Sequence, residues 1–379
     1  MKVLIISSDS TFFKKDAGGD VWQRHLAYAQ NLEKLFIAVK AASSANYATI
    51  VKDNVTVIPS GGKNRFSIIK NLYRKSAQII RQQEVDLVNT QDPMIYGLIG
   101  YLLCRKFKIP LVMNWHGDFL ENHAWLKEKP INRILVYLAK FLAKRADALR
   151  AVSPKIKIKL LKLGLAEQKI KVIPTPVDLE KFLTYDPVLW SNLSQKYQDK
   201  KVVLFVGRLE AVKNLALALR VFKRVVKQIP SARLLIIGEG GLRSQLDEII
   251  KEERLAGEVE LLGLIDHDQL SSYYRLAKVL ILPSAHESFG KVILEAAMQQ
   301  TPTLASQTTG ASSIIEEEEL LFPVNNEEEF LRKLSRLLSE ETLRQHLGQK
   351  LYYEVKDRYS WAESVRAVNQ MWQELSKNN

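Results

Sequence analysis

The feature that most constrains this chain is an alternation of short apolar runs with helical patterns, and this alternation starts twice. The first series begins at Lys2–Ser7 and continues to about residue 173. Val202–Val206 opens a second series, and Gly207 ends that run. Because strands joined through helices pair in parallel and need helices on both faces, the pattern predicts two α/β units in series. A length of 379 residues is also enough for two cores.

The expected elements follow from the apolar runs and from the turn residues between them. In the first unit we expect strands at Lys2–Ser7, Leu35–Val39, Val55–Pro59, Leu87–Asn89, Leu111–Trp115, Ala148–Val152 and Val172–Ile173. In the second we expect them at Val202–Val206, Arg233–Ile237, Val259–Leu262, Val279–Leu282 and Thr303–Ala305. Helices such as Val21–Asn31 and Ile131–Arg145 fall between strands, and the tail adds two more, Glu327–Leu338 and Ser360–Leu375. The proline-containing stretch Ile173–Pro187 is the expected linker.

Nothing in the apolar runs predicts export or a membrane span. The N-terminal residues MKVLIISSDS have one lysine and a short apolar run, which favours a first strand over a signal peptide. The longest apolar candidate, Ile95–Cys104, falls short of the roughly 18 residues that a span needs. Cys104 is the single cysteine, so no internal disulfide can form. We therefore expect a cytoplasmic protein.

The net charge of +13 is unevenly distributed. Residues 1–186 hold 30 Lys and Arg against 16 Asp and Glu, so the excess lies in the first half. This asymmetry predicts an anionic partner for that half: a membrane, a nucleic acid or a phosphorylated substrate. The segments Ile131–Arg145 and Lys155–Lys162 place cations beside apolar residues. They fit either contact with an anionic leaflet or a helix whose apolar face packs on the sheet and whose basic face is solvated.

The strongest local signal is PSAHESFGKVILEAA, residues Pro283–Ala297. It follows the strand Val279–Leu282 and opens a helix, and helix N-termini at the carboxyl ends of strands bind phosphate. Glu287 and Glu295 are eight residues apart. Counted as helix, that is about 12 Å, more than the roughly 5–9.5 Å of a hydrolase pair. The pattern favours two hydroxyl-binding carboxylates over an acid and base couple.

These residues, taken with motifs elsewhere in the chain, resemble the retaining glycosyltransferases of family 4, which have the GT-B fold. Glu287 and Glu295 match that family's E-x7-E motif. The other matching segments, in chain order, are Ala17-Gly18-Gly19-Asp20 with Trp22 and His25, Asn114–Phe119, Lys144–Asp147 through Ser153, Val206–Leu209 with Lys213-Asn214, Gly238-Glu239-Gly240, and the tail from Tyr359-Ser360-Trp361. The resemblance covers nearly the whole chain, and the ordered set of motifs is specific.

The resemblance implies two Rossmann-like domains facing each other across a cleft. Residues 1–175 would bind the acceptor, residues 176–360 would bind the nucleotide sugar, and the last helix, 361–379, would cross back to the first domain. The implied reaction moves a hexosyl unit from the donor to an acceptor with retention of configuration. No residue presents itself as a covalent nucleophile, so the family's front-face route is expected, in which the leaving phosphate helps to deprotonate the acceptor.

Four residues receive catalytic roles from the resemblance: His116, Arg208, Lys213 and Glu287. Arg208 and Lys213 place two cations at a strand end, where they would stabilise the departing diphosphate. His116 would hydrogen-bond a sugar hydroxyl or stabilise positive charge at the reacting carbon. Glu287 would hold the hydroxyls of the donor sugar.

The remaining expected binding residues lie in loops that follow strands or begin helices. They are Gly18, Gly19, Asp20, Asp118, Gly207, Ser288, Phe289, Gly290, Lys291 and Glu295. Gly18 and Gly19 would let the backbone approach a diphosphate closely, because no Cβ intervenes. Glu295 would hold the ribose hydroxyls.

We expect no metal and no other cofactor, and a UDP- or GDP-sugar as the donor substrate. Asp266-His267-Asp268 has the form of the D-x-D motif of metal-dependent transferases, but Asp268 also fits a helix cap. Two loops depart from the family: Thr175-Pro176 stands where Asn-Gly is common, and Glu316–Glu319 replaces a turn that contains Gly. These changes are expected to alter nucleotide contacts.

Two other functions fit parts of the same pattern. One is a nucleotide-sugar epimerase on the same fold, which would act on the donor without an acceptor. The other is a non-catalytic module that binds RNA or an anionic surface through the basic half. The complete set Arg208, Lys213, Glu287 and Glu295 favours the transferase, so no nucleic-acid partner is expected. The expected acceptor is a cell-surface polysaccharide or a lipid-linked glycan, reached from the cytoplasm with peripheral contact at the inner face of the membrane.

Overall fold

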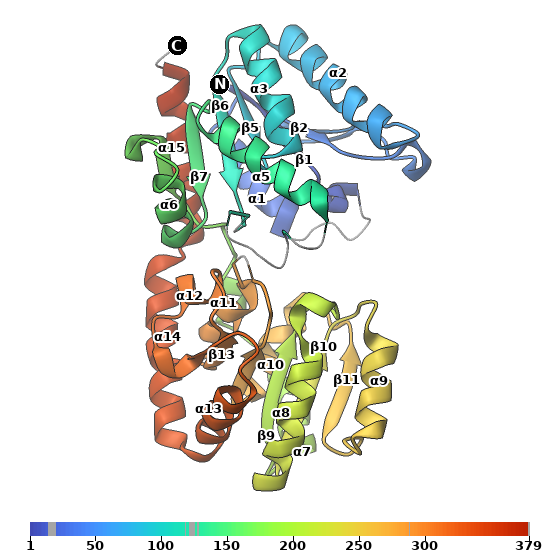
Figure 1. Ribbon diagram of the computed structural model, residues 1–379, viewed down its shortest axis with the longest axis vertical. Coiled ribbons are helices and arrows are strands. Elements are labelled where there is room, and N and C mark those ends of the chain that lie inside the picture. The colour runs from blue at the N-terminus through green and yellow to red at the C-terminus, as the bar shows by residue number, and fades with distance from the viewer. Residues whose placement is uncertain (14–19, 118, 121–125, 127–128, 288, 378–379) are drawn as a thin grey trace. The chain divides into compact units, whose positions relative to one another are not determined.

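The chain is organised as two compact α/β units. The structure is a computed structural model that describes residues 1–13, 20–117, 119–120, 126, 129–287 and 289–377. Unit 1 comprises Met1–Pro176 together with Trp361–Asn379, and unit 2 comprises Val177–Ser360 (Figure 1). Each unit has the expected parallel sheet with helices on its faces.

Unit 1 is built on an eight-stranded sheet. Strands β1 to β8 are Lys2–Ser7, Lys34–Val39, Ile50–Lys52, Val55–Pro59, Leu87–Thr90, Leu111–Trp115, Ala148–Ala151 and Ile170–Val172. Their order across the sheet is β3-β4-β2-β1-β5-β6-β7-β8. All pairs are parallel except β3 with β4, which is antiparallel. The sequence analysis missed β3, because this edge strand has only three residues and no buried side chain to mark it.

Helices cover both faces of this sheet and form two separate cores. The helices of unit 1 are α1 (Asp20–Ala29), α2 (Arg65–Gln83), α3 (Ile95–Phe107), α5 (Pro130–Ala143), α6 (Pro154–Leu161) and α15 (Trp361–Lys377). Leu4 and Ile6 of β1 belong to the core under α2, α3, α5 and α6. Val3 and Ile5 belong to the core under α1 and α15. Successive strand residues point to opposite faces, so this nearly continuous apolar strand serves both cores.

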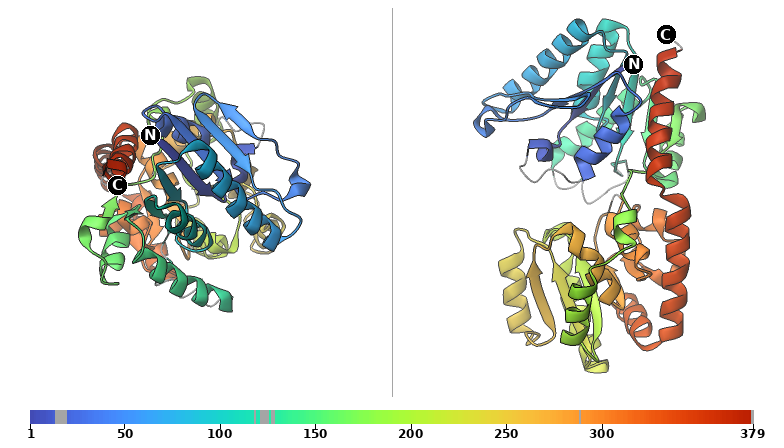
Figure 2. Two further views of the ribbon diagram at one scale, coloured as in Figure 1. Left: turned by 90° about the horizontal axis from the view of Figure 1, so that it is seen from above. Right: turned by 180° about the vertical axis from the view of Figure 1, so that it is seen from behind.

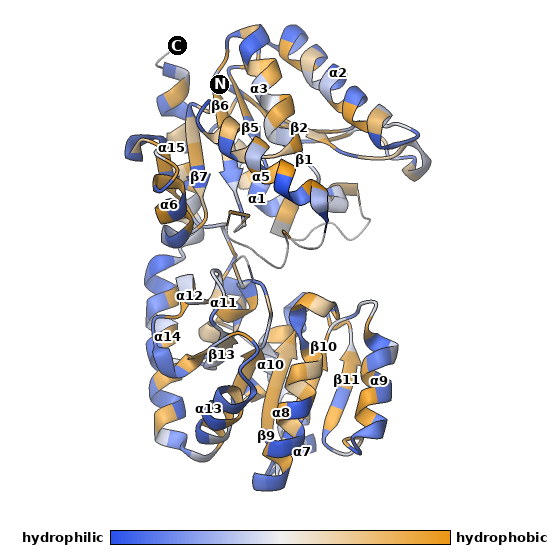
Figure 3. Ribbon diagram, viewed as in Figure 1, coloured by the Kyte–Doolittle hydropathy of each residue, from blue (hydrophilic) through white to orange (hydrophobic). Residues whose placement is uncertain are grey.

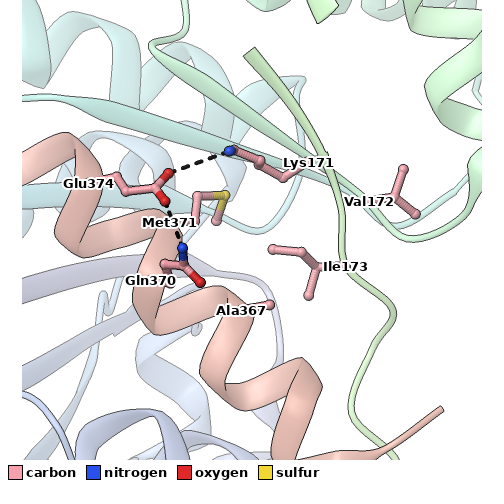
Figure 4. A pocket seen from close by; sticks show the side chains of 7 residues that line it. All are labelled: Lys171, Val172, Ile173, Ala367, Gln370, Met371 and Glu374. Carbon is pink, nitrogen blue, oxygen red and sulfur yellow. Dashed lines mark hydrogen bonds and ion pairs between the residues drawn. The ribbon is translucent and has the colours of Figure 1, made fainter. Parts of the chain in front are cut away.

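The C-terminal helix α15 completes the second core of unit 1. It lies against α1 on one face of the sheet (Figure 2). Trp372 is only 1% exposed, and its ring meets that of Tyr28 edge-on with centroids 5.6 Å apart. A shallow pocket separates α15 from the edge strand β8, where Lys171 and Glu374 lie 3.4 Å apart (Figure 4).

A buried arginine holds the chain where it leaves the sheet of unit 1. The Arg150 guanidinium donates to the carbonyl oxygens of Ile173 and Pro174, at 3.0 and 2.6 Å, and to the Tyr28 hydroxyl at 3.4 Å. These charge-assisted bonds satisfy both the buried cation and carbonyls that lie beyond β8.

Unit 2 is a six-stranded parallel sheet with one core. Strands β9 to β14 are Lys201–Val206, Ala232–Ile237, Val259–Gly263, Val279–Leu282, Thr303–Ser306 and Leu321–Phe322. Their order is β11-β10-β9-β12-β13-β14, and the inner strands are strongly apolar (Figure 3). The helices are α7 (Pro187–Lys196), α8 (Leu215–Gln228), α9 (Arg243–Glu252), α10 (Leu270–Leu276), α11 (Lys291–Met298), α12 (Ala311–Ile314), α13 (Glu327–Ser339) and α14 (Glu341–Arg358).

Both expected tail helices are present as α13 and α15, but the sequence analysis missed α14, which lies between them. Its buried positions include Arg344 and Gly348, so the apolar period that reveals a helix is weak there. Gly348 has a packing reason: an added Cβ would stand 2.1 Å from the carbonyl oxygen of Gln300. The backbone of α14 therefore approaches the end of α11 closely. The short strand β14 was also missed.

The acidic run Glu316–Glu319 contacts α13 and α14. The Glu316 carboxylate lies 2.6 Å from the Arg358 guanidinium, and Glu317 pairs with Lys350. These ion pairs are partly exposed and screened by water, so they contribute little to stability. Their observed role is to attach the loop to the helices that follow it.

Within the described part of the chain, no helix is both long enough and apolar enough to cross a lipid bilayer.

Replacing Trp372 tests whether α15 is an integral part of unit 1. We expect Trp372→Ala to lower the free energy of unfolding by about 3–5 kcal/mol, because it removes a fully buried indole. Urea denaturation of the full chain measures the change. Gln373→Ala is the matched control on the exposed side of the same helix. Equal unfolding midpoints for the two variants would contradict the prediction.

Candidate active site

The strand order of unit 2 determines where a ligand can reach its sheet. From β9 the chain moves outward to β10 and β11, and β12 then returns to the other side of β9. Open α/β sheets bind ligands outside the carboxyl ends of the strands at this reversal. The loops after β9 and β12 therefore form the candidate active site, and they contain Arg208, Lys213 and Glu287.

The loop after β9 is pressed against the loop after β10. The backbone N–H of Leu209 donates to the Glu239 carbonyl at 3.0 Å. Gly238 has a φ of +138°, and an added Cβ would lie only 1.9 Å from the carbonyl oxygen of Gly207. A side chain at Gly238 is incompatible with this contact. The two glycines thus fix the loop that carries Arg208.

Arg208 presents an accessible cation at this edge. Its side chain is 74% exposed, and Nη1 lies 2.7 Å from the Glu210 carboxylate. An exposed ion pair of this kind contributes only about 0–1 kcal/mol, so an anionic ligand can compete for the guanidinium. The planar fork suits bidentate contact with phosphate oxygens.

Lys213 and Glu287 form the central pair of the site. Lys213 Nζ lies 2.5 Å from Glu287 Oε2, and the two side chains are only 15% and 16% exposed. The loop around the pair is tied on both sides. The Ala285 N–H donates to the Val212 carbonyl at 2.9 Å, and the Gly310 N–H donates to the Glu287 carbonyl at 2.8 Å. Loops from β9, β12 and β13 therefore meet at Glu287, the first through its carboxylate and the last through its backbone carbonyl.

The start of α11 supplies backbone groups to the same edge. Gly290 precedes the helix with a φ of +85°, and Lys291 is its first residue. Phe289 is buried with its ring centroid 5.8 Å from that of Tyr359, so it offers a ligand its backbone only. Because the helix starts after Glu287, the helix-based spacing of about 12 Å for the two glutamates does not apply. Ser288 lies outside the described residues.

Glu295 is held inside unit 2. The Tyr274 hydroxyl donates to Glu295 Oε2 at 2.7 Å, and His267 Nε2 lies 3.8 Å from Oε1. Tyr274 is fully buried, and this burial together with the adjacent carboxylate raises its pKa. The phenol therefore stays protonated and remains a donor to Glu295. Sequence reasoning missed Tyr274 and did not connect His267 with Glu295.

The Asp266-His267-Asp268 segment forms a turn of 3-10 helix over His267–Gln269. The capping role expected for Asp268 is wrong, because Gln269 occupies the N-cap of α10 and makes no side-chain cap. Across the ranges that the structure covers, no group of three or more His, Cys, Asp or Glu side chains is placed to hold a metal ion.

In unit 1 the corresponding reversal lies between β1 and β5, and His116 follows the next strand, β6. His116 Nε2 lies 2.8 Å from Gln91 Oε1, and the Gln91 N–H donates to the Ile6 carbonyl at 3.0 Å. Gln91 was not singled out from sequence. Of Asp20, which begins α1, only the backbone is described. Three expected residues fall outside the described ranges: Gly18, Gly19 and Asp118.

Asp92, next to Gln91, is the second residue that the sequence analysis missed in this region. Its Oδ1 accepts the backbone N–H of Met94 at 2.6 Å, at the start of α3. Burial raises the pKa of Asp92 to about 6, because desolvation of the charged form outweighs the backbone N–H groups that favour it. This carboxyl can therefore change its protonation state near neutral pH.

Two Rossmann-like units in series, with charged residues at the strand-order reversal, place the chain among enzymes of the GT-B fold. Residues 190–352 match the family model for glycosyl transferases group 1. Residues 23–181 match the model for glycosyltransferase family 4. The chain therefore belongs to the group 1, family 4 glycosyltransferases.

Relatives and solved structures agree with this assignment. An uncharacterised glycosyltransferase of Methanocaldococcus jannaschii is 27% identical over 82% of this chain and 81% of its own length. The alpha-monoglucosyldiacylglycerol synthase of Streptococcus pneumoniae is 25% identical over 62% and 54%. Sucrose-phosphate synthase from Thermosynechococcus elongatus superposes with a TM-score of 0.84, at 21% identity over 100% of both chains. Anabaena HepE in complex with UDP-glucose gives 0.76, at 18% identity over 100% of both.

Gly238→Ala tests the backbone contact between the loops after β9 and β10. We expect a loss of more than about 2 kcal/mol in the free energy of unfolding, because the new Cβ must displace the Gly207 carbonyl. Gly241→Ala is the matched control, since nothing lies within 4 Å of a Cβ at that position. Thermal denaturation compares the two variants. A Gly238→Ala protein as stable as the Gly241→Ala protein would refute the contact.

Asp92→Asn tests the raised pKa. Since the folded-state pKa of about 6 exceeds the unfolded value of 3.8, the folded state holds the proton more tightly. The contribution of Asp92 to stability is therefore present at low pH and lost as the pH rises toward and above 6. As the pH rises through that range, the free energy of unfolding of Asp92→Asn should rise relative to that of the parent, by up to about 3 kcal/mol. Urea unfolding at several pH values measures the difference, and a constant difference would contradict the assignment.

Proposed function

We propose that this glycosyltransferase takes a sugar from a nucleotide-sugar donor bound by unit 2 and transfers it with retention of configuration. The observation that carries the proposal is the Lys213–Glu287 pair at the strand-order reversal, beside the exposed cation of Arg208. The cation and the carboxylate lie side by side, and a nucleotide sugar likewise places its diphosphate next to its sugar. The diphosphate needs positive charge, and the sugar hydroxyls need an acceptor of hydrogen bonds.

The donor then has a defined orientation on unit 2. Arg208 and Lys213 bind the diphosphate, the N–H groups around Gly290 add backbone donors, and Glu287 accepts from the sugar hydroxyls. Glu295 binds the ribose hydroxyls, held in place by the Tyr274 hydroxyl at 2.7 Å. The likeness to a fold that holds UDP-glucose in Anabaena HepE supports a uridine nucleotide as the first donor to test.

Catalysis on this proposal is the stabilisation of a leaving group. The bond between the anomeric carbon and the phosphate oxygen breaks, and the diphosphate gains negative charge beside Arg208 and Lys213. The acceptor hydroxyl attacks from the same face, and its proton passes to the departing phosphate oxygen. In unit 1, His116 hydrogen-bonds the sugar or stabilises the positive reacting carbon. Gln91, 2.8 Å from His116, orients the imidazole.

The acceptor on this proposal is a lipid-linked glycan or a surface polysaccharide, bound by unit 1. A relative named as a glucosyldiacylglycerol synthase and the basic first half of the chain support a lipid-linked acceptor. A nucleotide-sugar epimerase remains the alternative within the same fold. Incubation with labelled donor separates the two, since an epimerase changes the donor without any acceptor.

Arg208→Ala tests donor binding without disturbing the core, because the side chain is largely exposed. UDP-, GDP- and ADP-sugars should be screened by thermal shift, and a sugar nucleotide that binds should raise the melting temperature. Loss of a charged hydrogen bond should lower the affinity for that donor by about tenfold to a hundredfold. Arg220→Ala is the matched control, an exposed arginine paired with Glu327 on α13. Equal donor affinity in both variants would overturn the site.

A further inference from the structure

Helix α5 of unit 1 presents large apolar side chains to solvent. Its packed face consists of Asn132, Val136, Ala139, Leu142 and Ala143, and Leu135 and Leu138 also contact the core of unit 1. The exposed large residues are Ile131 at 51%, Ile134 at 63%, Tyr137 at 73% and Phe141 at 46%. From sequence, this segment was expected either to contact an anionic leaflet or to pack its apolar face on the sheet. The structure has one face packed against unit 1 and a separate apolar face that points to solvent.

The exposed residues form one surface, here called the α5 outer face: Ile131, Ile134, Tyr137 and Phe141. The α5 members are spaced by three, three and four residues, so they lie along one side of the helix. Helix α3 packs beside α5 (Figure 1), and the Tyr101 ring meets Phe141 at a centroid distance of 6.3 Å.

Cations border this apolar stripe. Residues 129–145 contain five Lys and Arg and no Asp or Glu. At 100° per residue, Arg133, Lys140 and Lys144 lie on one flank of the stripe, and Arg145, which follows the end of the helix, lies in line with the stripe. The Arg145 guanidinium stands 3.5 Å from the centre of the Phe141 ring. Figure 3 shows the mixture of apolar and charged residues along α5.

We propose that the α5 outer face docks into the interface of an anionic lipid bilayer. The apolar stripe would enter the boundary between headgroups and acyl chains, and the flanking cations would reach lipid phosphates. Tyr137 has the amphipathic ring that favours this depth. A helix of 14 residues is about 21 Å long, short of the roughly 30 Å of a hydrocarbon core. The helix therefore lies along the surface.

The charge pattern favours a bilayer over other occupants. In a two-fold dimer each patch meets its own copy, so the cations of residues 129–145 would meet the same cations with no Asp or Glu among them. A nucleic acid would take the cations but leave the apolar stripe in water. An anionic lipid interface satisfies both parts. This docking is independent of the proposed donor site, and a lipid-linked acceptor would make it part of substrate access.

Co-sedimentation of the full chain with vesicles tests the proposal. The parent protein should pellet with vesicles of equimolar phosphatidylglycerol and phosphatidylcholine, and it should remain in solution with phosphatidylcholine alone. Ile134→Ser with Tyr137→Ser, and separately Lys140→Glu with Lys144→Glu, should each weaken binding at least about tenfold. Val188→Ser with Tyr353→Ser is the matched control, because it removes two comparably exposed apolar side chains from unit 2.

The same variants distinguish folding defects and alternative partners. Their melting temperatures and their thermal shifts with sugar nucleotides should match the parent, so a failed donor site and a failed docking face give different results. The proposal is overturned if the parent protein does not bind anionic vesicles, or if the control variant loses as much vesicle binding as the α5 variants. Self-association or RNA binding that depends on α5, without vesicle binding, would also overturn it.

A fluorophore at Tyr137 gives an independent measurement. The single native cysteine, Cys104, is buried, and burial raises the pKa of its thiol, so it reacts poorly. An environment-sensitive dye attached to Tyr137→Cys should shift its emission to the blue on addition of anionic vesicles. The same dye on Val188→Cys should not respond. Equal responses at the two positions would refute insertion of α5.

Discussion

The ion pair of Lys213 and Glu287 is the interaction around which the site of unit 2 is built. It joins a loop after β9 to a loop after β12, at the two strands between which the order of the sheet reverses. Both side chains are mostly shielded from water, so each neutralises a charge that would otherwise be costly to bury. The pair also keeps a donor and an acceptor of hydrogen bonds at one point, before any ligand arrives.

The other charged residues of the site differ from this pair in how firmly they are held. Glu295 is fixed by the buried Tyr274, whereas Arg208 projects into solvent with only Glu210 beside it. The site therefore combines buried, hydrogen-bonded carboxylates with one exposed cation. Such a division suits a ligand whose nucleoside must be positioned and whose phosphate charge changes during reaction.

Most of the fold could be predicted because buried parallel strands are almost continuously apolar, as in β9 and β12. The misses have local causes: β3 is a short exposed edge, and α14 carries Arg344 and Gly348 on its buried side. The ends of the strands, and so the positions of His116 and Glu287, also followed from the sequence. The partners of His116 and Glu295 did not follow from the sequence, because Gln91 and Tyr274 are far from these residues in the chain and meet them only through tertiary packing. The outward orientation of α5 was equally invisible, since a helical period does not tell which of two apolar sides meets the sheet.

Helix α15 is made after all of unit 2 and yet covers one face of the first sheet. Val368 and Trp372 are buried against residues near the N-terminus, among them Tyr28. During synthesis, unit 2 can close as soon as α14 has emerged, while unit 1 keeps an apolar face open until α15 has left the ribosome. The order in which the two units mature is then the reverse of their order along the chain.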